Sequence, residues 1–182
     1  MRHRIRQAAA IAAALVYLLP GGDGDAAGCL RPPVDAPISR AFEQPPCPWC
    51  AGHRGITYAT LDGTAVAAAA AGSVTFSGVV VDVRYVVVRH GDGLLATYGG
   101  LRSSPLVAGD RVTAGAHVGR TDGELYFGLR AGPDAYVDPQ RYLGELVVPP
   151  YLVPTDGTPG RPPPAPQLSC RRIPAAAADG SA

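Results

Sequence analysis

The chain has 182 residues, with 16 basic and 15 acidic side chains and a formal net charge of +1. A net charge so close to zero gives no indication of the positive surface that nucleic-acid binding requires. It also gives no indication of long-range attraction to an acidic membrane or a polyanionic substrate. Once a leader and a tail are set aside, the length leaves one domain of about 120 residues, which is enough to bury a hydrophobic core.

The N-terminal segment, residues 1–28, has the features of a secretory signal peptide. Arginines near the start precede an apolar run from Ala8 to Leu19, and small residues follow just before Cys29. The run is too short to span a membrane, which takes about 20 apolar residues. We therefore predict an extracytoplasmic protein that is either secreted or associated with the cell envelope.

The sequence Ala-Ala-Gly-Cys that ends at Cys29 also resembles a lipoprotein box, in which this cysteine would be acylated. Polar residues 21–25 separate the box from the apolar run, and this separation favours plain export. Membrane attachment is therefore expected only through an acylated Cys29 or through a retained N-terminal anchor.

The four cysteines of an exported chain are read first as disulfides. Cys47 and Cys50 can close a short local ring, and Cys29 and Cys170 would then join the two ends of the domain. Acylation of Cys29 would leave Cys170 unpaired. Two alternatives stay open for Cys47-Pro-Trp-Cys50: part of a zinc site with His53, and a thiol redox pair.

The middle of the chain has the pattern of short strands separated by glycine turns. Residues 30–52 are rich in proline and cysteine and predict an irregular opening segment, and Ala67–Ala71 predict a strand or its approach rather than a helix. The predicted strands are Val74–Phe76, Val79–Val83, Tyr85–His90, Leu94–Tyr98 and Glu124–Leu129. Such spacing predicts an all-β fold, an antiparallel sandwich or barrel, over residues 29–146. Residues 147–182 predict a proline-rich tail that ends in a low-complexity segment.

Five segments, in order, carry a resemblance to a known family. They are GHRGITYATLDGTAVAAAAAGSVTFSG, RYVVVRHGDGLLATYGGL, LVAGDRVTAGAHVGRT, ELYFGLR and AYVDPQRYL. Together they are similar to the LytM/lysostaphin-type zinc endopeptidases of peptidoglycan, over roughly residues 31 to 145. The resemblance implies an antiparallel β-domain of that type, in which one zinc is held by His-x-Gly-x-Asp and by the second histidine of His-x-His.

Carried over position by position, the resemblance implies that most of the zinc site is lost. His53 matches the first ligand, but Thr57 stands in place of the aspartate and Tyr126 in place of the third ligand. Glu124 and Gly100 replace the two histidines that would serve catalysis. A catalytic zinc needs about three protein ligands and an open position for water. No cofactor is therefore expected, and zinc only if the site has been rebuilt.

Alternate side chains of a strand share a face, so Glu124 and Tyr126 should point into the cleft while Leu125 and Phe127 face the core. The exposed pair could still bind a ligand by hydrogen bonds. Trp49 and the tyrosines could line a sugar or peptide groove, although packing is their commoner role. We expect Arg130 to make a structural ion pair.

Three functional hypotheses follow. The first is a catalytically inactive envelope module that binds peptidoglycan or regulates a wall hydrolase. The second is a zinc endopeptidase with a site rebuilt from His53, Glu124, Tyr126 and the cysteines. The third is an extracytoplasmic thiol oxidoreductase that uses Cys47 and Cys50.

Overall fold

The computed structural model describes residues 29–155 and 158–170, and nearly all of its regular structure is strand. The predicted signal peptide, residues 1–28, lies outside the described residues. The elements are β1 Ile38–Arg40, β2 Ile56–Ala59, β3 Ala65–Ala67, β4 Gly72–Val80, β5 Val83–His90, β6 Leu95–Ser103, β7 Arg111–Val112, β8 His117–Arg130, β9 Tyr136–Val137, the 3₁₀ helix η1 Pro139–Arg141, β10 Glu145–Val147 and β11 Gln167–Ser169.

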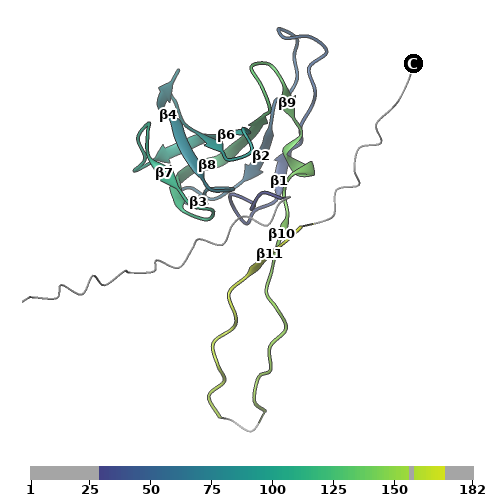
Figure 1. Ribbon diagram of the computed structural model, residues 1–182, viewed down its shortest axis with the longest axis vertical. Helices are drawn as coiled ribbons and strands as arrows, with labels where there is room; N and C mark the ends of the chain where they lie inside the picture. The colour runs from purple at the N-terminus through teal and green to yellow at the C-terminus, as the bar shows by residue number, and fades with distance from the viewer. Residues whose placement is uncertain (1–28, 156–157, 171–182) are drawn as a thin grey trace, which may run out of the picture.

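The main sheet is antiparallel, with strand order β1-β2-β8-β6-β5-β4-β7. Strands β3 and β9 pair with β8 as well, at its opposite ends. Strand β8, with 14 residues, is therefore the central strand, and it pairs with β6 on one side and β2 on the other (Figure 1). The predicted fold class, all-β and antiparallel, is confirmed. No helix within residues 29–155 and 158–170 is long and apolar enough to cross a membrane.

One face of this sheet forms the hydrophobic core. Leu125, Phe127 and Leu129 on β8 are fully buried, and the Phe127 ring lies 5.3 Å from that of Tyr98 on β6. The Tyr98 hydroxyl accepts a hydrogen bond from the backbone N–H of Ala69 at 2.8 Å, so its polar atom has a partner inside the core. The period-2 prediction for β8 is confirmed, because Glu124 is exposed and Tyr126 is only half-buried.

The predicted strand Val79–Val83 is wrong, because a hairpin turn interrupts it. Strand β4 ends at Val80 and β5 begins at Val83, and these two residues pair directly. Val81 and Asp82 have φ values of 44° and 68°, the left-handed conformation that two-residue hairpin turns with the right twist require. A continuous run of β-branched residues hides this turn in the sequence.

The opening segment is less irregular than predicted. Ile38–Arg40 form β1 and pair with β2, and Leu30 forms a parallel bridge with Leu143. Residues 68–71, which follow β3, form no helix, and this agrees with the prediction for the alanine run.

Both predicted disulfides are present, and one of them joins the C-terminal segment to the domain. Cys29 is bonded to Cys170, with their Cα atoms 5.6 Å apart, and Cys47 is bonded to Cys50. Strands β10 and β11 pair next to the first disulfide. The chain between them projects from the domain as a long arm (Figure 1). The segment predicted as a tail therefore includes β11, which is held against the domain.

Candidate functional site

His53 lies just before β2, where a β-bridge to Glu43 fixes its backbone. Only 9% of the residue is exposed. Its Nδ1 lies 2.8 Å from the carbonyl oxygen of Ala41. A carbonyl oxygen can only accept, so Nδ1 carries the hydrogen, and the lone pair of the neutral ring is on Nε2.

Thr57, at the position of the family's aspartate, hydrogen-bonds to this second nitrogen. Its Oγ1 lies 3.2 Å from Nε2 of His53. In the neutral imidazole the hydroxyl donates to the ring lone pair. Both ring nitrogens of His53 thus have hydrogen-bond partners within the protein.

Tyr126, at the position of the third ligand, faces Thr57 across the β2–β8 pair. Its ring meets the His53 ring edge-on, with centroids 5.7 Å apart. The ring lies over two glycines. A Cβ on Gly55 would be 2.8 Å from ring carbons, and a Cβ on Gly128 would be 2.7 Å from the hydroxyl oxygen. The phenol oxygen therefore lies over Gly128, along the strand from the Thr57–His53 pair.

The environment of Tyr126 favours its neutral form. Burial raises the pKa of Tyr126 to about 12, and the nearby Tyr136 and Tyr85 hydroxyls also raise it, while the Arg54 cation lowers it. The phenolate that would bind a metal is thus disfavoured at neutral pH. Glu124 lies exposed at the other end of this stretch of β8, opposite Ala59.

Gly100 closes the position of the remaining family histidine. Its φ of 76° is in the left-handed region, and a Cβ there would lie 2.7 Å from the carbonyl oxygen of Glu124. A side chain at this position would therefore require both backbone strain and movement of β8. Restoring the family histidine here would therefore destabilise the fold.

The residues at these five positions do not fit a zinc ion. A catalytic zinc takes three protein ligands, from imidazole, thiolate or carboxylate groups. Here the three ligand positions offer one imidazole, one threonine hydroxyl and one protonated phenol. The Glu124 carboxylate stands at the position of a catalytic histidine and lies exposed at the other end of this stretch of β8. Within the described part of the chain, no group of three or more histidine, cysteine, aspartate or glutamate side chains could hold a metal. The four cysteines are bonded in pairs.

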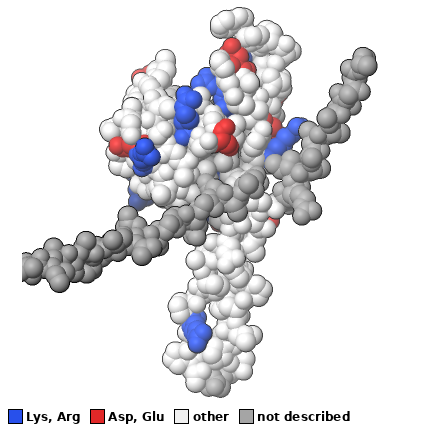
Figure 2. All heavy atoms as spheres, viewed as in Figure 1, with Lys and Arg blue, Asp and Glu red and all other residues white. Residues whose placement is uncertain are grey.

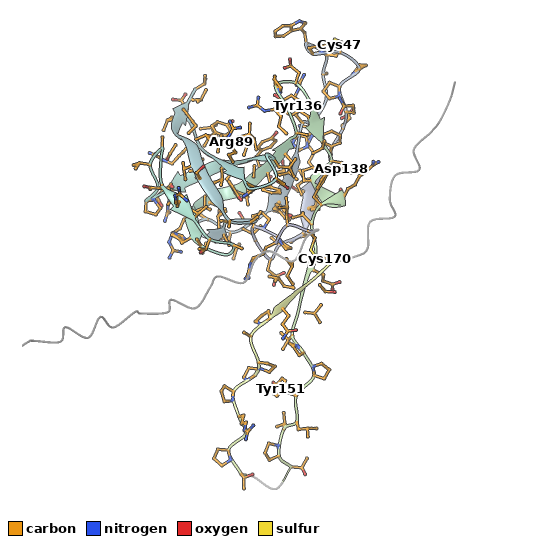
Figure 3. The ribbon with its side chains drawn as sticks, in the orientation of Figure 1. Cys47, Arg89, Tyr136, Asp138, Tyr151 and Cys170 are labelled. Carbon is orange, nitrogen blue, oxygen red and sulfur yellow. A yellow bond between two sulfur atoms is a disulfide. The ribbon has the colours of Figure 1, made fainter. Side chains whose placement is uncertain are left out.

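A second group of residues gathers beside this site, and the sequence pattern did not reveal it. The Cys47–Cys50 loop contacts Arg54, whose Nη2 donates to the carbonyl oxygen of Pro48 at 2.6 Å. The guanidinium also lies 5.5 Å from the centre of the Tyr136 ring on β9. Figure 3 shows the labelled Cys47 and Tyr136 on the same side of the molecule. Trp49, named from the sequence as a possible groove residue, is 95% exposed in this loop.

Arg130 and Asp138 have structural roles outside the candidate site. Arg130 was expected to make an ion pair, and this was wrong. Its Nη1 donates to the carbonyl oxygen of Pro133, and it is absent from the ion pairs found among the described residues. The loop that follows β8 turns back at this point, so a carbonyl oxygen lies where a carboxylate was expected. Asp138 caps η1 by accepting from the N–H of Gln140.

The chain matches a known protein family. The sequence pattern of peptidase family M23 matches residues 51–139. Rv3786c, an uncharacterized protein of Mycobacterium tuberculosis, is 34% identical over 121 residues. That alignment covers 56% of this chain and 27% of the relative, so this chain spans about a quarter of the curated relative's length.

Solved structures share the fold. Helicobacter pylori Csd3 is 26% identical with a TM-score of 0.55, and the match covers 64% of this chain and 35% of that one. The SpoIIQ–SpoIIIAH pore-forming complex contains a chain that is 17% identical with a TM-score of 0.52, and that match covers 64% of this chain and 91% of that one. The antiparallel sheet and the order of the motifs define an M23-type β-domain. The domain of this chain is of the LytM type, and residues 51–139 match peptidase family M23.

Proposed function

We propose that this protein is an exported cell-envelope protein whose M23-type domain binds peptidoglycan without cleaving it. The shortage of ligands carries the proposal, because His53 is the one imidazole at the three ligand positions, while Thr57 offers a hydroxyl and Tyr126 a protonated phenol. A zinc-activated water is how a metallopeptidase makes its nucleophile near neutral pH. Without ligands to hold that ion, the domain keeps the outer face of β2 and β8 but lacks the zinc-bound water.

Two side chains on the outer face of β8 support binding rather than catalysis. Tyr126 presents a half-buried phenol that is neutral at physiological pH, and Glu124 presents an exposed carboxylate on the same face of β8. A phenol both donates and accepts hydrogen bonds, and a carboxylate accepts them. The amides of a wall peptide offer matching groups. Association with a wall hydrolase, as a regulator, is the other outcome that the experiment below distinguishes.

The disulfides support a location outside the cytoplasm. Two disulfides persist where the environment is oxidising, as in secreted and envelope proteins. The predicted signal peptide over residues 1–28 agrees with this location. The SpoIIQ–SpoIIIAH complex is an example of the same fold in a protein assembly, so a protein partner is compatible with the fold.

The experiment incubates the mature protein, purified without added metal, with isolated peptidoglycan sacculi. We expect co-sedimentation with the sacculi and no release of soluble fragments, and native mass spectrometry should show no zinc. His53→Ala should leave this result unchanged, as should the control His117→Ala, because His117 is exposed at the start of β8, nine residues before Tyr126. About one zinc per chain, together with fragment release that His53→Ala abolishes and His117→Ala does not, would establish the zinc endopeptidase instead.

A further partner assay separates wall binding from hydrolase regulation. The protein is added to a purified wall hydrolase and sacculi, and the rate of fragment release is followed. Wall binding alone predicts co-sedimentation with sacculi that contain no other protein. A change in the hydrolase rate without such co-sedimentation would assign the regulatory role instead.

A further inference from the structure

A cavity of about 650 Å³ lies beside the former zinc site, and none of the family's zinc positions lines it. Its walls come from the Cys47–Cys50 loop, from Arg54 and from the chain that leads into β9. The side chains that matter for its chemistry are Trp49, Arg54, Asp134 and Tyr136. The cavity thus combines one cation, one carboxylate and two aromatic rings.

Arg54 is held in place but keeps most of its hydrogen-bonding capacity. Its Nη2 donates to Pro48, and its guanidinium plane lies over the Tyr136 ring. A guanidinium has five N–H donors, so one bond to a carbonyl leaves the others available. The ion pairs found among residues 29–155 and 158–170 do not include Arg54, and its charge is therefore not neutralised by a carboxylate at contact distance.

Trp49 is presented to solvent by a closed ring. The disulfide and the backbone bond from the Cys50 N–H to the Cys47 carbonyl, at 3.1 Å, restrain the loop on both sides of the tryptophan. The indole of Trp49 is 95% exposed and so contributes nothing to the core, and tryptophan is one of the residue types enriched in binding hot spots. A restrained loop also loses little conformational entropy when a ligand binds.

Asp134 places an acceptor in the same cavity. It lies in the loop between β8 and β9, and its carbonyl oxygen accepts from the Tyr136 N–H at 3.2 Å. The side chain is free of the ion pairs seen among the described residues. A ligand that carries both an anionic oxygen and an N–H donor complements Arg54 and Asp134 together.

We propose that this cavity binds the free carboxyl end of a short peptide. Arg54 donates to the terminal carboxylate, Asp134 accepts from a peptide N–H, and Trp49 and Tyr136 contact the aliphatic side chains. This inference rests on the proposed function, since it names the part of a wall peptide that the domain recognises. A charge-assisted hydrogen bond to a carboxylate contributes more than a neutral one, so the terminal charge decides the specificity.

The chain offers its own probe, because Trp49 is its only tryptophan. Intrinsic fluorescence is titrated with N-acetyl-Ala-Ala as the free acid and as the C-terminal amide, each in the L,L and D,D forms. We expect the free acid to bind at least about tenfold more tightly than the amide. Added salt should weaken the binding of the acid only.

Three variants test the assignment. Arg54→Gln should abolish the difference between acid and amide, whereas Arg54→Lys should keep part of it because the positive charge remains. Arg102→Gln is the matched control, because Arg102 is an exposed arginine paired with Asp62 away from the cavity. If Arg54→Gln alters the fluorescence of the unliganded loop, the Arg54→Lys result decides.

Equal binding of acid and amide to the wild type, or no response of Trp49 to either, would overturn the proposal. So would an unchanged preference in Arg54→Gln. Co-sedimentation with sacculi is measured on the same preparations. Sacculus binding without a preference for the acid defeats only this inference, whereas a preference for the acid without sacculus binding defeats the proposed wall-binding function and leaves the cavity assigned.

Discussion

The two faces of β8 differ in what the family pattern has preserved. On the core face, Leu125, Phe127 and Leu129 are fully buried. On the opposite face, Glu124 and Tyr126 occupy positions where the family has functional histidines. Burial of apolar area stabilises the sheet whatever the other face contains, so the fold can persist while the chemistry changes.

The changed face is nevertheless internally consistent. Thr57 pairs with His53, the Tyr126 ring lies on Gly55 and Gly128, and the Gly100 backbone passes close to Glu124. Each replacement fits its neighbours, so no single reversion would recreate a metal site. The residues on this face therefore contact one another closely, although they no longer form a set of zinc ligands.

The largest expected effect separates the two faces by stability. Phe127→Ala should lower the free energy of unfolding by about 3–5 kcal/mol, because it opens a cavity beside Tyr98 in the core. Tyr126→Ala should cost about 1–2 kcal/mol, because part of that ring is in solvent. Denaturant unfolding of both variants measures the difference. Equal losses would mean that the outer face supports the fold as much as the core does.

The next effect tests whether Gly100 is structurally required. Gly100→Ala should lower stability by about 1–3 kcal/mol, because the residue has φ 76° and a Cβ would crowd the Glu124 carbonyl. Gly91→Ala is the matched control, since nothing lies within 4 Å of a Cβ there. It should change stability by less than about 0.5 kcal/mol. Thermal unfolding at equal protein concentration compares them, and a neutral Gly100→Ala would show that a side chain can be accommodated.

The sequence predicted the parts of this structure in which apolar and polar residues alternate. It missed the turn and the glycine position, whose backbone conformation leaves no such pattern. Alternating apolar residues correctly assigned Leu125 and Phe127 to the core. The turn at Val81 and Asp82 was missed because its residues are unusual for a left-handed turn. Glycine has no side chain to form a pattern, so the role of Gly100 could be seen only from its φ and its neighbours.

The sequence predicted which zinc ligands are missing from the candidate site, but not the contacts that the residues in their place make. The motif comparison identified Thr57 as the substitute for an aspartate, yet the hydrogen bond to His53 depends on the geometry of the bridge at Glu43. The cavity beside it was not predicted because Arg54 and Tyr136 are far apart in the chain. The β8–β9 pairing and the Arg54–Tyr136 contact bring them together.

The smallest effect concerns the ionisation of Tyr126. Its folded pKa is about 12, against about 10 for an exposed phenol, so the unfolded chain ionises first as pH rises. The contribution of the protonated hydroxyl is fully present below about pH 10 and is lost as the pH rises toward 12. The chain contains no lysine, but it has eight tyrosines, and burial also raises the pKa values of Tyr58 and Tyr98, so these two residues contribute to the same pH window. Because Tyr126 is half-buried, we expect the wild type to lose about 1–2 kcal/mol more over that range than Tyr126→Phe, which keeps the contributions of Tyr58 and Tyr98. Urea unfolding at pH 9 and pH 11.5 compares the two proteins. Equal losses of the free energy of unfolding in the two proteins would show that the Tyr126 hydroxyl is exposed to solvent. The Tyr126 ring would then not be packed against its neighbours on the outer face.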